Sequence, residues 1–176
     1  MAGSLVKIDE EIVSSAVASV TLGGSDWDSS YDVYMVKVMN CTPDTDGVGL
    51  HFRFTESGTP NSTSNYDYAL KNLRTASGFS NGVGVNQIRG LVTGGATGSA
   101  GNETANSIMY IFNANNSSEY TFTTIEGVIL SSASSELRGG QGGNVFTSAS
   151  SVDGVQIFFD SGNIESGTFT LYGLKK

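Results

Sequence analysis

The residues that could act in catalysis are few in this chain. His51 is the single histidine and Cys41 is the single cysteine. Nucleophilic catalysis needs a base within hydrogen-bonding reach of the nucleophile, and no G-x-S-x-G turn or comparable motif accompanies His51. Cys41 has no basic neighbour in the sequence that would lower its pKa. We therefore expect a half-exposed strand histidine, an ordinary free thiol and no enzymatic activity.

The acidic residues offer two further kinds of chemistry. A glycosidase would need two carboxylates roughly 5–10 Å apart, but most of the 17 acids lie in turns or at strand ends, where Asp caps backbone amides. Calcium takes oxygen ligands from acid-rich loops, and two clusters have that character: Asp26, Asp28 and Asp32, and the pair Asp44 and Asp46. Neither follows the EF-hand pattern. Turn capping is the favoured interpretation, so no metal and no cofactor is predicted.

Aromatic side chains in loops could instead bind a sugar ring or a protein partner by stacking. Trp27 lies in a polar turn, and Tyr31, Tyr66 and Tyr68 lie near predicted strand ends. We take these four as candidate glycan or partner contacts. Strand aromatics more often belong to the core, and a turn tryptophan can fold back as a lid over the end of a sandwich.

Composition narrows the classes of partner. The formal charge of −8 and the pI near 4.4 argue against binding a phosphate backbone, which depends on clustered Lys and Arg. No apolar run approaches the roughly 18 residues that span a bilayer, and the N-terminus has acids where a signal peptide would be apolar. We expect no nucleic acid partner, no membrane insertion and synthesis in a cytoplasm. A single cysteine excludes an intrachain disulfide.

Period-two alternation and turn residues predict most of the secondary structure. Strands are expected over 13–22, 31–39, 49–56, 107–113 and 120–130, with a short one at 145–147 after the glycine-rich turn 138–144. Within the second of these segments, Tyr34–Met39 is apolar on both faces apart from Lys37, as in a central strand. Residues 66–74 could be a strand or a short helix, and a strand is favoured. Within 76–106, the apolar island 83–92 is expected to be one strand between two exposed loops. Residues 154–160 and 167–174 are expected to pair as a terminal hairpin.

The fold class follows from this pattern. Nine or ten strands at roughly 8–15-residue spacing, without a convincing amphipathic helix, predict an all-β, antiparallel, jelly-roll-like β-sandwich. The 38% hydrophobic and 10% aromatic content supplies a core, while only 15% of residues are charged. We expect one domain over residues 1–176, with residues 1–12 as an N-terminal arm.

Two stretches resemble structural proteins of tailed bacteriophages, especially marine ones. In residues 27–58, a D-S-x-Y-D-x-Y strand leads to an N-x-x-P-x-x-D turn and an alternating strand. Residues 154–176 resemble the ending of the same proteins, with the signature S-G-N-I-x-S-G-T-F-x-L-Y-G. The resemblance covers about a third of the chain and does not extend to residues 56–106.

The resemblance implies a virion component and assigns no catalytic residue. The leading hypothesis is a non-enzymatic virion protein, assembled in the host cytoplasm, that packs on capsid or tail proteins, as decoration or in an accessory role, as a symmetric homo-oligomer. The alternative is a receptor-binding or glycan-adhesive domain of a tail fibre or spike, which would bind host-surface glycan.

Overall fold

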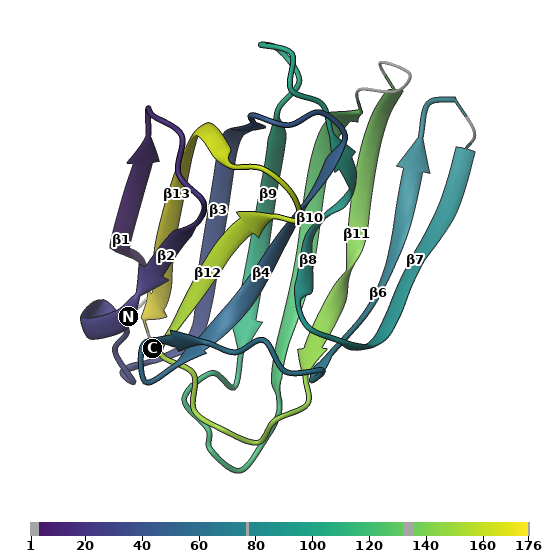
Figure 1. The fold of residues 1–176 in the computed structure, drawn as a ribbon. Helices are drawn as coiled ribbons and strands as arrows, with labels where there is room; N and C mark the ends of the chain where they lie inside the picture. The colour runs from purple at the N-terminus through teal and green to yellow at the C-terminus, as the bar shows by residue number, and fades with distance from the viewer. Residues whose placement is uncertain (1–3, 77, 132–135, 176) are drawn as a thin grey trace.

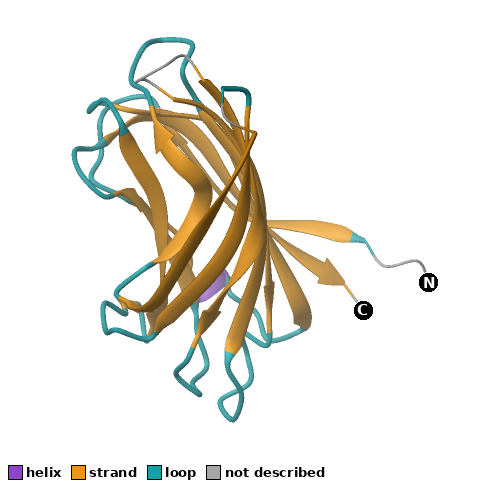
Figure 2. Cartoon of the chain, turned by 90° about the vertical axis from the view of Figure 1, so that its right-hand side faces the viewer, coloured by secondary structure: helices purple, strands orange, loops and turns teal. Residues whose placement is uncertain are grey.

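Two antiparallel β-sheets pack face to face in the computed structural model, which describes residues 4–76, 78–131 and 136–175. Eight strands form the larger sheet, in the order β1-β13-β3-β9-β10-β11-β6-β7 (Figure 1). In the smaller sheet, of five strands, β12 lies between β2 and β4, and β4 also pairs with β5 and β8. Figure 2, seen from the β7 side, shows the two layers. The predicted antiparallel β-sandwich is confirmed.

The described residues contain thirteen strands, more than the nine or ten predicted. Those of the larger sheet are β1 (Leu5–Val13), β3 (Tyr31–Pro43), β6 (Tyr66–Arg74), β7 (Gly78–Gln87), β9 (Ala105–Phe112), β10 (Thr121–Ser131), β11 (Glu136–Phe146) and β13 (Ile164–Lys175). Those of the smaller sheet are β2 (Val20–Gly23), β4 (Val48–Glu56), β5 (Thr59–Pro60), β8 (Gly90–Thr97) and β12 (Gly154–Phe159). A 3-10 turn, η1 (Gly24–Asp26), precedes β3. Within the described ranges, no helix has the length and apolar character needed to span a membrane.

The core lies between the sheets and follows the alternation read from the sequence. Leu50, Phe52 and Phe54 of β4 are fully buried, and Phe169 of β13 joins the same cluster from the opposite sheet. Burying each such side chain stabilises the fold by roughly 1.5–3 kcal/mol. The other face of β4, predicted to be solvent-exposed, is more buried than expected. There His51 is buried, because it packs beside the backbone of Gly90.

Two of the turns that connect the sheets lie against each other. The turn at 44–47 carries the chain from β3 to β4, and the turn at 160–163 carries it from β12 to β13. The Asp44 carboxylate accepts hydrogen bonds from the Asn163 backbone N–H (2.8 Å) and side-chain amide (2.9 Å). The Asp44 N–H in return donates to the Asn163 carbonyl (3.0 Å). Gly162 adopts a φ of 71°, a conformation that favours glycine, in the second turn.

This arrangement replaces the predicted terminal hairpin. β12 pairs with β2 and β4 in the smaller sheet, whereas β13 pairs with β1 and β3 in the larger sheet. Both segments are strands, as predicted, but they do not pair with each other. The four-residue turn is held at its first residue, Asp160, by Gly49 and at its last residue, Asn163, by Asp44, both more than 100 positions away.

Glycine-rich segments form strands where turns or loops were predicted. The segment 138–144 lies inside β11, and the island 83–92 divides between β7 and β8. A Cβ added at Gly140 would lie 2.8 Å from the Cα of Gly94 in β8, and one at Gly142 would lie 2.6 Å from the Leu70 Cβ. Glycine is required here because β8 and neighbouring side chains approach the β11 backbone closely.

The N-terminal segment also differs from expectation. Leu5–Val13 forms β1, which pairs antiparallel with β13 from Leu5 opposite Leu174 to Val13 opposite Gly167, so it is an edge strand and not a free arm. The strand expected over 13–22 is limited to β2, Val20–Gly23. Before it, Ala16 and Ala18 are exposed, because their alternation has no neighbouring sheet to face.

Phe169→Ala should lower the free energy of unfolding by about 3–5 kcal/mol, because a fully buried ring would leave a cavity between the sheets. Chemical denaturation followed by circular dichroism measures this loss. Phe122→Ala, which removes a ring that is 46% exposed on β10, is the matched control and should cost clearly less. Equal losses in the two variants would contradict the assignment of Phe169 to the core.

Candidate functional site

The first two aromatic candidates form one cluster beside the start of β3. The Trp27 ring stacks on Tyr34, with centroids 4.0 Å apart and planes at 16°, and Tyr31 meets the same ring edge-on at 6.0 Å. The Tyr34 hydroxyl donates to the Asp28 carbonyl, and the Asn115 side-chain amide donates to the Tyr34 oxygen (3.0 Å). Trp27 and Tyr31 are half-buried. Trp27 therefore acts as a lid on the sandwich and presents only part of its ring.

The other two aromatic candidates lie on β6, separated from β3 in the sheet by β9, β10 and β11. Tyr66 is fully buried, and its ring centroid lies 4.9 Å from that of Phe146. Its hydroxyl accepts from the Phe54 N–H (3.0 Å) and donates to the Asn61 carbonyl (3.1 Å). Tyr66 therefore faces the core and presents no exposed ring to a glycan or partner. Tyr68 is half-buried beside β7, so the four candidates do not form one site.

His51 lies in a polar cluster on the smaller sheet. Its Nδ1 contacts the Gly90 carbonyl (3.3 Å), and its Nε2 lies 3.6 Å from an Asp160 carboxylate oxygen. The Arg89 Nη2 atom lies 3.7 Å from the same Asp160 oxygen. Burial, together with the positive charge of Arg89, lowers the pKa of His51 to about 4, although Asp160 acts in the opposite direction. The ring is therefore neutral at pH 7 and contributes to packing.

Cys41 is a buried thiol. Burial raises its pKa to about 12, so the thiol remains protonated and poorly nucleophilic at neutral pH.

Two of the acidic residues considered as calcium ligands cap turns instead. Asp28 accepts from the Ser30 N–H and hydroxyl, both at 2.8 Å, and Asp44 binds Asn163. These hydrogen bonds lower the pKa of each carboxyl group. Asp46 accepts from the Ser99 N–H (3.1 Å). Among residues 4–76, 78–131 and 136–175, no group of three His, Cys, Asp or Glu side chains is placed to hold a metal ion.

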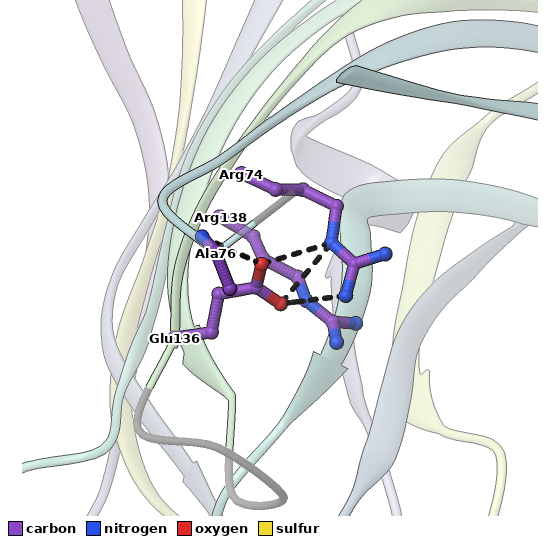
Figure 3. Close-up of polar contacts among 4 residues, drawn as sticks. All are labelled: Arg74, Ala76, Glu136 and Arg138. Carbon is purple, nitrogen blue, oxygen red and sulfur yellow. Dashed lines mark hydrogen bonds and ion pairs between the residues drawn. The ribbon is translucent and has the colours of Figure 1, made fainter. Parts of the chain in front are cut away.

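A buried carboxylate between two arginines went unrecognised in the sequence. Glu136 accepts from Arg74 Nε (3.1 Å) and Nη2 (2.7 Å), from Arg138 Nε (2.8 Å) and from the Ala76 N–H (3.2 Å) (Figure 3). Its side chain is 1% exposed. The hydrogen bonds from Arg74 are the largest cause that lowers the pKa of Glu136 to about 2. The cluster connects β6 to β11. No local sequence motif predicts it, because Arg74 and Glu136 are 62 residues apart.

The outer face of the larger sheet, turned away from the smaller sheet, carries exposed apolar side chains on neighbouring strands. We call this the apolar band: Met39, Leu73, Phe79, Ile108 and Val128, each at least 40% exposed. Val128 lies opposite Gly139, Gly139 opposite Leu73, and Leu73 opposite Phe79. A depression of about 480 Å³ is lined by Met39, Leu73, Ile108 and Val128 of this band, together with Gly139, Lys37 and Glu126. The sequence signal was that 108–112 is apolar at successive positions, which indicates two apolar faces.

Comparison with known proteins adds no family to these observations: no protein-family model matches the chain, and no curated protein matches it significantly. The likeness of residues 27–58 and 154–176 to phage structural proteins stays a prediction.

Acidification should weaken the fold through His51. Its folded pKa of about 4 lies below the unfolded value near 6.5, so between these values the unfolded chain binds a proton that the folded chain does not. Stability is then complete above pH 6.5 and falls as the pH approaches 4. Between pH 7 and pH 5, His51 should account for a loss of about 1–2 kcal/mol.

His51→Gln removes this titrating ring, so the variant should lose less stability than the wild type between pH 7 and pH 5 in urea denaturation. Identical pH dependence in the two proteins would show that His51 is not held neutral in the folded state.

Glu136→Gln should destabilise the protein at pH 7, because Arg74 and Arg138 lose their charged acceptor. The pKa of Glu136 is lowered in the folded state, so its contribution is present above about pH 4.5 and is lost as the pH falls toward 2. Denaturation at pH 7 and pH 3 should therefore show a smaller difference between wild type and variant at pH 3. Glu119→Gln, at an exposed position, is the control and should be near neutral at both. A gap that widens at pH 3 would refute the ion cluster.

Proposed function

We propose that the chain is a non-enzymatic structural component of a tailed-bacteriophage virion, assembled on the capsid or the tail. The observation that carries this proposal is that the two phage-like stretches meet in the fold. β3 and β4, from the first, pair with β13 and β12, from the second, and Asp44 binds Asn163 between the turns. Two likenesses that are far apart in sequence thus belong to one structural unit, which supports a common origin for that unit.

The apolar band supports an assembly role. Contiguous exposed apolar patches are uncommon on monomeric proteins, and their burial against a partner is favourable because apolar surface leaves water. The band lies on the rigid strands β3, β6, β7, β9 and β10. The partner proposed for it is a neighbouring virion protein.

The chemistry of the likeliest catalytic side chains agrees with a binding role. His51 is neutral and buried against the Gly90 carbonyl, and the Cys41 thiol is protonated and buried. Neither is positioned to attack a substrate from solvent.

The alternative, a receptor-binding or glycan-adhesive domain of a tail fibre or spike, has weaker support. Half-buried Trp27 and Tyr31 expose part of their rings at one place, but the Trp27 face is occupied by Tyr34. Immunogold labelling separates the two functions: label over the head, or along the tail, fits assembly, whereas label confined to the tail tip fits receptor binding.

Gradient-purified particles washed in high salt should retain this protein in a fixed ratio to the major capsid protein or a tail protein. Apolar contacts resist salt, because screening weakens exposed charge pairs far more than buried apolar area. Quantitative mass spectrometry measures the ratio before and after washing. Absence, or erratic trace amounts, would make a free soluble binding protein the better account.

A matched pair of variants tests the surface. Val128→Glu places a charge in the apolar band and should reduce incorporation into particles. Thr21→Glu adds the same charge at an exposed position of β2 in the smaller sheet and should be incorporated normally. Both should keep the wild-type circular dichroism spectrum. Equal incorporation of the two variants would exclude the apolar band as the assembly surface.

A further inference from the structure

The two edges of the larger sheet differ in how they are protected against pairing. β1 carries charges within Lys7–Glu11 and has a register irregularity between Lys7 and Asp9. Charged side chains and bulges are the usual devices that stop a sheet edge from accepting another strand. β7, the opposite edge, has ten residues with no charge and no proline; its pairing with β6 is regular from Gly78 to Gly84 and has a register irregularity only beyond Gly84. Among the described strands it is a long edge left open for pairing.

The side chains of β7 divide between two contrasting faces. Those facing the smaller sheet are small and half-buried: Ser80, Gly82 and Gly84. Those on the outer face include three highly exposed apolar residues: Phe79 at 65%, Val83 at 72% and Val85 at 65%. A Cβ at Gly84 would lie 2.4 Å from the Tyr68 ring, so a side chain of β6 already occupies the space over this part of the inner face. An approaching strand would meet small residues and the Tyr68 ring on the inner face, and the exposed side chains of Phe79, Val83 and Val85 on the outer face.

We propose that β7 pairs antiparallel with β7 of a second copy of this chain, about a two-fold axis at Gly82, so that the two larger sheets become one continuous sheet. In this register Phe79 of each copy lies opposite Val85 of the other, and Asn81 lies opposite Val83. Both pairs occur twice, as a two-fold interface requires. Cross-strand pairs of aromatic and β-branched residues stabilise antiparallel sheets.

Other registers are poorer. A shift of one residue would place the apolar face of one copy beside the inner face of the other. A shift of two residues puts Phe79 opposite Gln87, or leaves Val85 opposite residue 77, beyond the described end of the strand. The register centred on Gly82 gives both Phe79 and Val85 an apolar partner.

Charge also favours β7 over β1 as the meeting point. The chain has a formal charge of −8, so two copies repel at long range, and acidic residues on β1 would add repulsion at contact. β7 itself carries no charge, and the Lys71 ammonium of β6 lies beside its outer face, on Asn81 (3.1 Å) and over the Phe79 ring. The long-range repulsion is screened beyond about 8–10 Å at physiological salt. Dimers should therefore become more stable as the salt concentration rises.

Sedimentation equilibrium of the purified full chain, at 0.15 M and 0.5 M NaCl, tests the proposal. The wild type should be dimeric at tens of micromolar, with a lower dissociation constant at the higher salt. Val83→Glu brings two carboxylates near the axis and should raise the dissociation constant at least tenfold. Ile12→Glu makes the same change on β1, at a position 66% exposed, and should leave the dimer intact. A monomeric wild type, or a Val83→Glu protein that dimerises normally, would overturn the proposal.

Cysteine cross-linking tests the register. In one strand, positions 79 and 85 are roughly 20 Å apart, too far for a disulfide, whereas opposed residues on paired strands are about 5 Å apart. The Phe79→Cys, Val85→Cys double variant should form covalent dimers on mild oxidation, and Phe79→Cys alone should not; buried Cys41 provides the shared background. Covalent dimers of the single variant, or none of the double, would refute this register. The inference goes beyond the proposed function, and the two proposals can fail separately. A chain that dimerises but is absent from virions would contradict only the proposed function, and a chain that is present in virions but monomeric would contradict only the dimer.

Discussion

The hydrogen bonds between Asp44 and Asn163 constrain two of the connections through which the chain passes between the sheets. Each of these residues lies in a turn that passes from one sheet to the other, so their hydrogen bonds hold both crossings together. Fixing the turns sets the register of β3 on β13 in the larger sheet and of β4 on β12 in the smaller one. Register matters because a slip of one residue would turn the core-facing side chains of these strands, including Phe52 and Phe169, toward solvent.

The unequal size of the sheets explains where the proposed association surfaces lie. The eight-stranded sheet buries one face against the five-stranded sheet, while its other face has no covering layer among the described residues. That free face carries the apolar band and ends at β7, an edge without charge. Glycines in β11 let β8 approach closely on the inner side, while Gly139 on the outer side contributes to the depression. Glycine therefore allows close packing against β8 on the inner face and leaves the depression open on the outer face.

Polar groups inside this fold serve mainly to hold strands together. Glu136 connects β6 to β11 through Arg74 and Arg138, and His51 lies between Gly90 and Asp160. Their pKa values shift in the direction that each environment dictates: cationic hydrogen-bond donors lower that of the carboxyl group, and burial lowers that of the imidazole. Both effects make the protein less stable in acid. Shifted pKa values here report structural stabilisation, which is consistent with a protein that acts through its surfaces.

The sequence by itself determined the fold class and most strand positions, because alternation in segments such as 49–56 and 120–130 reflects burial of one face. It also identified Asp28 and Asp44 as turn caps, a local property of the backbone. Only the tertiary structure decided the rest. Tyr66 is core and not surface, 154–174 is not a hairpin, and 138–144 is strand and not turn. In each case a partner distant in sequence, which local pattern cannot reveal, determined the space available to the residue.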